Sequence, residues 1–93
     1  MSKQKFQSVW DAIEDTPQLA ASMRARSELV IELTELIKRR GMTQAEAAKL
    51  FAVTQPRISD LTRGKIDLFS LDALIDMAAV AGLAPQIKIT KVA

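Results

Sequence analysis

The sequence predicts a small all-α domain of five helices followed by a short β-strand near its C-terminal end. Three observations predict it. Apolar residues recur at helical spacing over most of the chain, capping residues and glycines separate these stretches, and only residues 86–90 alternate with period two. The length of 93 residues fits one domain, and a composition of 48% apolar and 26% charged residues is typical of a chain that folds around a core.

The first expected helix is short and amphipathic. Ser8 is a candidate N-cap, and the apolar residues follow the i, i+3, i+4, i+7 spacing of one helical face: Phe6, Val9, Trp10 and Ile13. The Asp-Thr-Pro sequence at 15–17 then ends this helix, because proline disfavours helical backbone in the residue before it. Trp and Phe anchor cores and interfaces alike, so Phe6 and Trp10 are predicted either to pack on the next helix or to contact a partner protein.

A long second helix is expected from Pro17 to about Arg40. Thr16 is its predicted N-cap, its first turn tolerates the missing N–H of the proline, and Gly41 ends it. The predicted inward stripe consists of Leu19, Met23, Leu29, Val30, Leu33, Leu36 and Ile37. Ile31 lies off that stripe and is either a harmless exposed residue or part of a contact surface.

Two short helices are expected next. Thr43 and Glu46 have the spacing of a capping box, so a helix begins at Gln44, and it stops near residues 52–53. The following helix is capped by Thr54, contains a proline in its first turn and ends at a glycine.

The last expected helix follows a connector, residues 65–69. Ser70 caps this helix, Gly82 ends it, and its predicted inward residues are Leu71, Leu74, Ile75, Ala78 and Ala81. Met77 and Val80 fall off the inward face and are therefore predicted to contact a dimer mate or a partner.

The alternation over residues 86–90 predicts a short strand that contains Ile87 and Ile89. The sequence predicts no other strand with which it could pair, and a lone strand leaves its N–H and C=O groups unpaired. We therefore expect Ile87 and Ile89 to lie at a contact with a dimer mate or with a partner's sheet edge, the alternative being an ordered but unpaired tail.

The composition argues against most enzyme classes. The chain has no cysteine and no histidine, which excludes disulfides, thiolate chemistry, Cys and His zinc sites and histidine bases. Nor does it contain a glycine-rich phosphate loop or a metal-ligand spacing, so neither an enzyme nor a metal or cofactor is expected. No apolar run approaches the roughly 18–20 residues of a membrane span, and no signal-type stretch follows the polar first residues, so we expect a cytoplasmic protein without membrane contact.

Positive charge is concentrated in one segment. Residues 38–65 hold seven Lys or Arg against two acidic residues, a net of +5, whereas the whole chain carries +2. A local basic patch is what binding to a phosphate backbone requires, although a solvated basic face has the same composition.

Residues 44–63 have the spacing of a helix-turn-helix. Counted from Gln44, the fifth position requires a small residue where the helices cross, and the tenth, fifteenth and eighteenth favour β-branched residues or Leu. These four positions are occupied by Ala48, Val53, Ile58 and Leu61. The turn would hold the second helix roughly perpendicular to the first with polar side chains outward, and such a helix fits the major groove of DNA, about 12 Å wide.

Residues 43–64 resemble the helix-turn-helix of the XRE family, the Cro and phage-repressor type. Three further stretches are similar to the XRE subgroup that includes HigA-like antitoxins: residues 10–12, 24–29 and 64–72. The resemblance implies a five-helix, lambda-repressor-like DNA-binding domain. Its expected organisation is an N-terminal amphipathic segment 1–16, a DNA-binding domain 17–84 and a C-terminal strand or tail 85–93.

The resemblance also implies residue roles. Gln55 stands where phage repressors read adenine with a glutamine amide, and Gln44 stands where a glutamine binds phosphate and braces that reader. Arg57 has the reach for O6 and N7 of guanine, or for a phosphate. The other predicted contacts to the DNA backbone are Thr54, Ser59, Arg63 and Lys65.

Two residues fit the pattern less well. Ala52 stands where the family usually has glycine, and a left-handed backbone there would cost alanine about 1 kcal/mol. Asp60 would be repelled by DNA unless it accepts from N4 of cytosine or pairs with Arg57 or Arg63, and of these we expect the pair within the protein.

The resemblance implies a sequence-specific transcriptional repressor, the antitoxin of a type II toxin–antitoxin pair that represses its own operon and neutralises a RelE- or HigB-like toxin. Because one recognition helix reads few base pairs, we expect a homodimer on a palindromic operator with half-sites about 34 Å apart. A stand-alone regulator without a toxin, or a protein-interaction adaptor on the same fold, are the alternatives.

Overall fold

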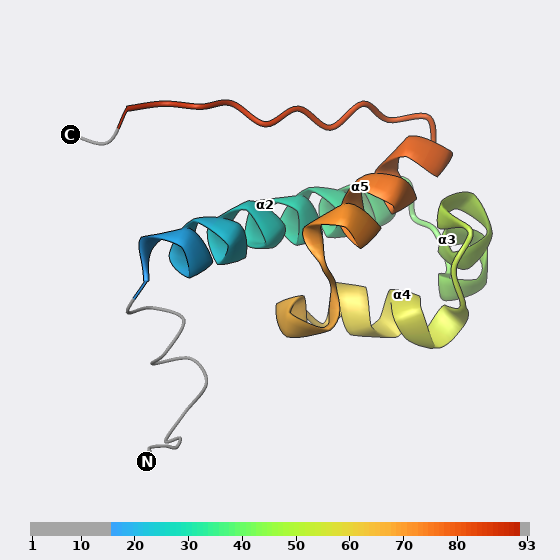
Figure 1. Ribbon diagram of the computed structural model, residues 1–93. Helices are drawn as coiled ribbons and strands as arrows, with labels where there is room; N and C mark the ends of the chain where they lie inside the picture. The colour runs from blue at the N-terminus through green and yellow to red at the C-terminus, as the bar shows by residue number, and fades with distance from the viewer. Residues whose placement is uncertain (1–15, 92–93) are drawn as a thin grey trace, which may run out of the picture.

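The computed structural model of the chain describes residues 16–91; residues 1–15 and 92–93 lie outside the described part. Over residues 16–91 the chain forms four α-helices and one 3₁₀ helix, shown in Figure 1: α2 (Pro17–Arg39), α3 (Gln44–Phe51), α4 (Gln55–Thr62), η2 (Ile66–Leu68) and α5 (Leu71–Val80). The bounds of these helices agree with the predicted caps and stops.

Helix α2 begins and ends where the sequence predicts. The Thr16 hydroxyl accepts a hydrogen bond from the backbone N–H of Leu19 at 3.3 Å, and Pro17 is the first helical residue. At the other end, Gly41 has a φ of 60°, the left-handed conformation that glycine adopts without strain. The chain can therefore turn sharply out of the long helix and into α3.

The hydrophobic core lies at the C-terminal half of α2, where α4 and α5 pack against α2, and α3 packs against α4 and α5. Its largest fully buried side chains are Phe51, Ile58, Leu61, Phe69 and Leu74. From α2 the core takes Val30, Leu33, Leu36 and Ile37, whereas Leu19, predicted inward, is 44% exposed. The N-terminal half of α2 thus projects beyond the core formed by residues 16–91 (Figure 1).

The predicted fold class is wrong in its details. The all-α character is right, but residues 16–91 contain four α-helices rather than five, and the predicted first helix, with Phe6 and Trp10, lies outside the described residues. The predicted C-terminal strand is also wrong, since residues 83–91 have no regular secondary structure. Alternation alone does not make a strand, because a strand needs a neighbouring strand to pair with, and none is present in residues 16–91.

Met77 requires a second correction. It was predicted to lie off the inward face of the last helix, yet it is 4% exposed and belongs to the core. The reason is that α5 packs against both α2 and α3 and so buries a wider face than one stripe. Val80, by contrast, is 59% exposed, and so is Ile31 on α2 at 58%, as predicted.

None of the helices in residues 16–91 combines the length and the apolar character that crossing a membrane requires.

Candidate nucleic-acid interface

Helix α3 begins at a complete capping box. The backbone N–H of Glu46 donates to the Thr43 hydroxyl at 3.1 Å, and the backbone N–H of Thr43 donates to Glu46 Oε1 at 2.9 Å. Two of the amide groups left unpaired at the start of a helix are thus satisfied. Gln44, the first residue of α3, is exposed directly after this cap.

The turn between α3 and α4 is short. Ala52 caps α3 with φ 57° and ψ 45°, so its backbone has the left-handed conformation that is unfavourable for alanine. The N–H of the next residue, Val53, donates to the carbonyl of Ala48 at 3.0 Å. Thr54 then returns to extended backbone, and its hydroxyl accepts from the N–H of Arg57 at 3.4 Å. Three residues, 52–54, therefore suffice to end α3, turn the chain and start α4.

The crossing of α3 and α4 follows the predicted pattern. Ala48 is 9% exposed where the two helices pack, while Ile58 and Leu61 of α4 are fully buried and Val53 is half-buried. The apolar side of α4 is thus held against the core, and its rotation about its own axis is determined.

The polar residues predicted to contact DNA lie around the outer side of this motif. Gln44, Thr54, Gln55, Arg63 and Lys65 are exposed, and Ser59 and Arg57 are half-buried. Exposed basic residues also lie at the end of α2 and on α3: Lys38, Arg39, Arg40 and Lys49. The motif thus offers exposed polar and basic side chains from neighbouring elements, as a surface for phosphates requires.

The Arg57 side chain does not extend freely into solvent. Its Nη1 donates to the carbonyl oxygen of Leu68 at 3.0 Å, and its guanidinium carbon lies 4.2 Å from the centre of the Phe69 ring. Sequence reasoning missed Leu68 and Phe69 as partners, because the contact depends on the path of the connector and no local spacing indicates it.

Asp60 does not pair as expected. In the described part of the chain it forms no ion pair with Arg57 or Arg63, although its backbone carbonyl accepts from the N–H of Lys65 at 3.1 Å.

Residues 16–91 also contain no group of three acidic side chains able to hold a metal ion.

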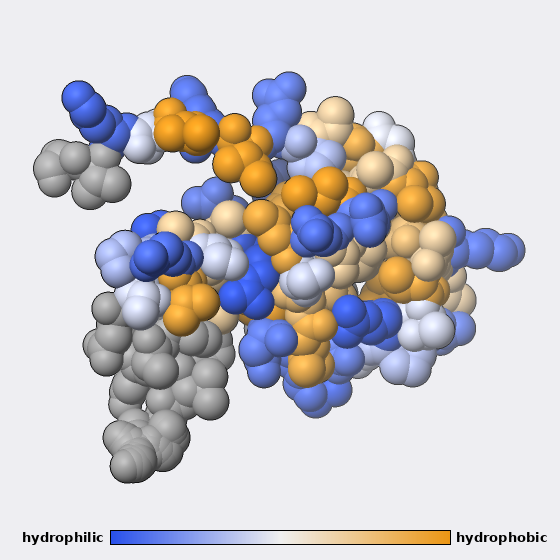
Figure 2. Space-filling model, in the orientation of Figure 1, coloured by the Kyte–Doolittle hydropathy of each residue, from blue (hydrophilic) through white to orange (hydrophobic). Residues whose placement is uncertain are grey.

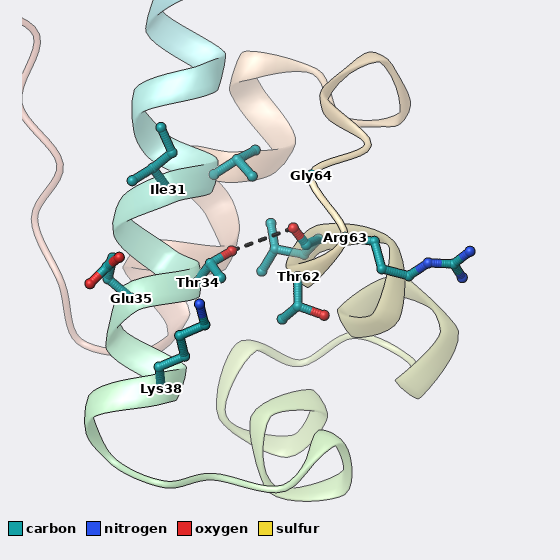
Figure 3. Close-up of a pocket in the computed structure, with 9 residues that line it drawn as sticks. Ile31, Thr34, Glu35, Lys38, Thr62, Arg63 and Gly64 are labelled. Carbon is teal, nitrogen blue, oxygen red and sulfur yellow. Dashed lines mark hydrogen bonds between the residues drawn. The ribbon is translucent and has the colours of Figure 1, made fainter.

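A groove of about 320 Å³ separates α2 from the C-terminal end of α4 (Figure 3). Across this groove the Thr34 hydroxyl donates to the carbonyl of Leu61 at 3.4 Å, and this hydrogen bond joins α2 to α4. The Arg63 side chain points out of this groove, away from α2. The Arg63 side chain can therefore contact a molecule bound along α4. The groove itself is lined by charges of both signs, such as Glu35 and Lys38.

The segment after α5 is an extended chain, which in the view of Figure 1 runs back above α2 toward the end at which that helix begins. Its Ile87 and Ile89 are 62% and 93% exposed, and Figure 2 shows apolar surface on this segment, standing off the body of the molecule between hydrophilic residues. Together with Val80, these residues form the exposed apolar part of the C-terminal region, called here the C-terminal apolar surface.

Two packed helices joined by a tight turn, with the second exposing a polar side, define a helix-turn-helix protein of the DNA-binding class. The comparison with protein families agrees: the chain belongs to a family of helix-turn-helix domains, whose model matches residues 12–90. No curated protein matches the chain.

Proposed function

We propose that this protein is a sequence-specific transcriptional repressor that places α4 in the major groove of its operator. The observation that carries the proposal is the orientation of α4. Its buried Ile58 and Leu61 face the core, so that the exposed Gln55 at its N-terminal end is available to bases. N-terminal residues of a recognition helix are the ones that reach base edges in this motif.

The proposed division of labour follows from exposure and chemistry. Gln55 offers a side-chain amide that pairs with N6 and N7 of adenine, and Gln44 lies at the start of the neighbouring helix to hold a phosphate. The other proposed phosphate contacts come from the middle of α4 and from the residues that flank it, namely Ser59 within the helix and Thr54, Arg63 and Lys65 around it. Such contacts orient the protein on the duplex without reading sequence.

We propose further that the repressor is a homodimer on a palindromic operator. One α4 reads only a few base pairs, so discrimination requires two copies with half-sites about 34 Å apart. The C-terminal apolar surface supports this proposal, because its exposed Val80, Ile87 and Ile89 would be buried by a second copy.

The test is a binding titration with duplex DNA from upstream of the protein's own gene, compared with a random duplex of equal length. Specific binding should exceed random binding, and log affinity should fall against log salt with a slope of about −0.9 for each phosphate neutralised. Equal affinity for both duplexes would contradict sequence-specific repression. Absence of duplex binding at low salt would favour a protein-interaction adaptor on this fold.

An antitoxin role is the finer part of the proposal. It is supported by the similarity of residues 24–29 and 64–72 to HigA-like antitoxins, two stretches that meet where Arg26 Nη1 donates to the Phe69 carbonyl at 3.4 Å. The proposed partner is a RelE- or HigB-like ribonuclease toxin, with Phe6 and Trp10 as candidate contacts.

Co-expression tests the antitoxin role. The protein of any toxin-sized reading frame beside the gene should arrest growth alone and cease to do so when this chain is present. Removal of residues 1–16 should abolish toxin binding by calorimetry if Phe6 and Trp10 form the contact, whereas retained binding would end that assignment. If no such reading frame adjoins the gene, the protein is a stand-alone regulator.

A further inference from the structure

The connector between α4 and α5 is held by two arginines that come from different helices. Arg57 of α4 donates to the carbonyl of Leu68 at 3.0 Å, and Arg26 of α2 donates to the next carbonyl, that of Phe69, at 3.4 Å. The Arg26 Nε also donates to the carbonyl of Ser22 at 3.4 Å, which fixes the side chain along its own helix. Three separate elements are therefore joined at one point.

The Arg57 contact combines a hydrogen bond with a ring contact. The guanidinium lies 4.2 Å from the centre of the Phe69 ring, within the distance at which a cation and an aromatic face attract each other. Phe69 is fully buried although it lies in a connector, and the guanidinium lies against its ring. If Arg57 moved into the DNA groove, it would give up both contacts and expose an aromatic side chain to water.

The geometry of α4 adds a second reason. Successive residues of an α-helix are about 100° apart, so Gln55 and Arg57 lie about 200° apart around the helix axis. The two side chains therefore point to opposite flanks of α4. If Gln55 faces the bases, Arg57 faces the connector, which is where the structure has it.

We propose that Arg57 is a positioning residue that stays on Phe69 when the protein binds its operator, and that with Arg26 it holds the connector against α4. The connector begins at Lys65, a proposed phosphate contact. Arg57 and Arg26 thus set the position of a phosphate contact relative to Gln55, the base reader. This inference rests on the proposed function, because it concerns the DNA complex, and it replaces the base contact that the sequence predicted for Arg57.

The direct test is the NMR signal of the Arg57 side chain in the full chain, free and bound to the upstream duplex. A guanidinium stacked on a ring places its Hδ and Hε protons in the ring current of Phe69, so these signals should be shifted in the free protein. The same shifts should persist in the complex. Their return to ordinary arginine values on DNA binding would overturn the inference.

Substitutions supply an independent measurement. Arg57→Ala should weaken binding to the operator, and to every operator variant with one base pair changed, by the same factor of roughly ten. The slope of log affinity against log salt should stay unchanged, because a docked Arg57 neutralises no phosphate. Loss of discrimination at a single base pair would show instead that Arg57 reads a base, and would overturn the inference.

Phe69→Leu removes the ring and leaves Arg57 in place. It should lower affinity as Arg57→Ala does, and the double variant should lose no more than the worse single one, because both remove one contact. Additive losses would contradict the inference. Arg24→Ala is the matched control, an exposed arginine of α2 whose loss should change neither affinity nor discrimination. Should Phe69→Leu fail to fold by circular dichroism, the NMR comparison and Arg57→Ala decide the question.

The two proposals fail differently. A chain that binds the upstream duplex no better than a random one overturns the proposed function. A chain that prefers the upstream duplex but releases Arg57 from Phe69 overturns only this inference.

Discussion

Ala52 has a backbone conformation that is unfavourable for a residue with a side chain. Its φ of 57° is the only positive value at a residue other than glycine in residues 16–91. A Cβ atom in the left-handed region crowds the carbonyl oxygen, so Ala52→Gly should stabilise the protein by about 1 kcal/mol and raise its Tm by roughly 4–8 °C. Thermal unfolding followed by circular dichroism measures the change.

The control for that substitution is Ala21→Gly, at an exposed position inside α2. There the backbone is helical, so glycine should destabilise the protein by about 0.5–1 kcal/mol. The two changes are chemically identical, and opposite signs would show that the conformation at Ala52 is the cause. If both substitutions destabilised the protein, the left-handed backbone at Ala52 would not be strained by its alanine side chain.

Substitutions at two further residues distinguish a side chain that reads a base from one that binds a phosphate. Gln55→Ala should cost about 1–3 kcal/mol on the operator and much less on random DNA, because it removes contacts to one base. Lys65→Ala should weaken binding to both duplexes about equally and reduce the salt slope by about 1. Fluorescence anisotropy over a salt series measures both quantities. If Gln55→Ala lowered the two affinities equally, Gln55 would not be the reader.

Single residues also show how far sequence reasoning extends. The positions of Ala48, Ile58 and Leu61 were predictable, because helix crossing and helical spacing are local properties of the motif. The docking of Arg57 was not predictable, since its partners lie 11 and 12 residues further on and meet it only through the path of the connector. For the same reason the burial of Met77 was missed, because it depends on which helices α5 touches.

At the level of elements, helix bounds follow from capping chemistry. Thr16, Thr43, Thr54 and Ser70 each accept a hydrogen bond from the backbone N–H three residues on, and each was predicted from the sequence. The strand predicted over residues 86–90 failed because alternation reports which side chains are apolar and not whether a pairing strand exists.

The capping box of α3 supports a prediction of its own. Thr43→Ala removes the hydroxyl that accepts from Glu46, and it should cost about 1 kcal/mol of stability, a fall in Tm of roughly 4–8 °C. Thr62→Ala is the control: its hydroxyl donates to the carbonyl of Ile58 within a helix, where alanine is favoured, so stability should change by less than about 0.5 kcal/mol. Equal effects would show that the cap is not what starts α3.

For the whole molecule, stability and assembly reside in different parts of the chain. The core ends with α5 and the residues that follow it closely, and residues 86–91 contribute no buried side chain to it. Substitutions in the extended segment should therefore leave the melting of a single copy unchanged. Such substitutions should instead change the oligomeric state of the protein and its affinity for an operator with two half-sites. Binding to both half-sites depends on a fixed distance between the two α4 helices of a dimer.

Replacement of Ile87 and Ile89 by serine tests this separation. If the C-terminal apolar surface joins two copies, the double variant should sediment as a monomer at concentrations where the unchanged protein is a dimer, with helical content preserved. Lys88→Ser is the matched control, because in an extended chain its side chain points to the opposite side from both isoleucines, so the dimer should persist. On the operator, the monomeric variant should fill the half-sites independently and bind a single half-site as tightly as the unchanged chain, because each copy carries its own intact α4. A double variant that remained a dimer would move the interface away from this segment, toward another exposed apolar residue such as Ile31 on α2.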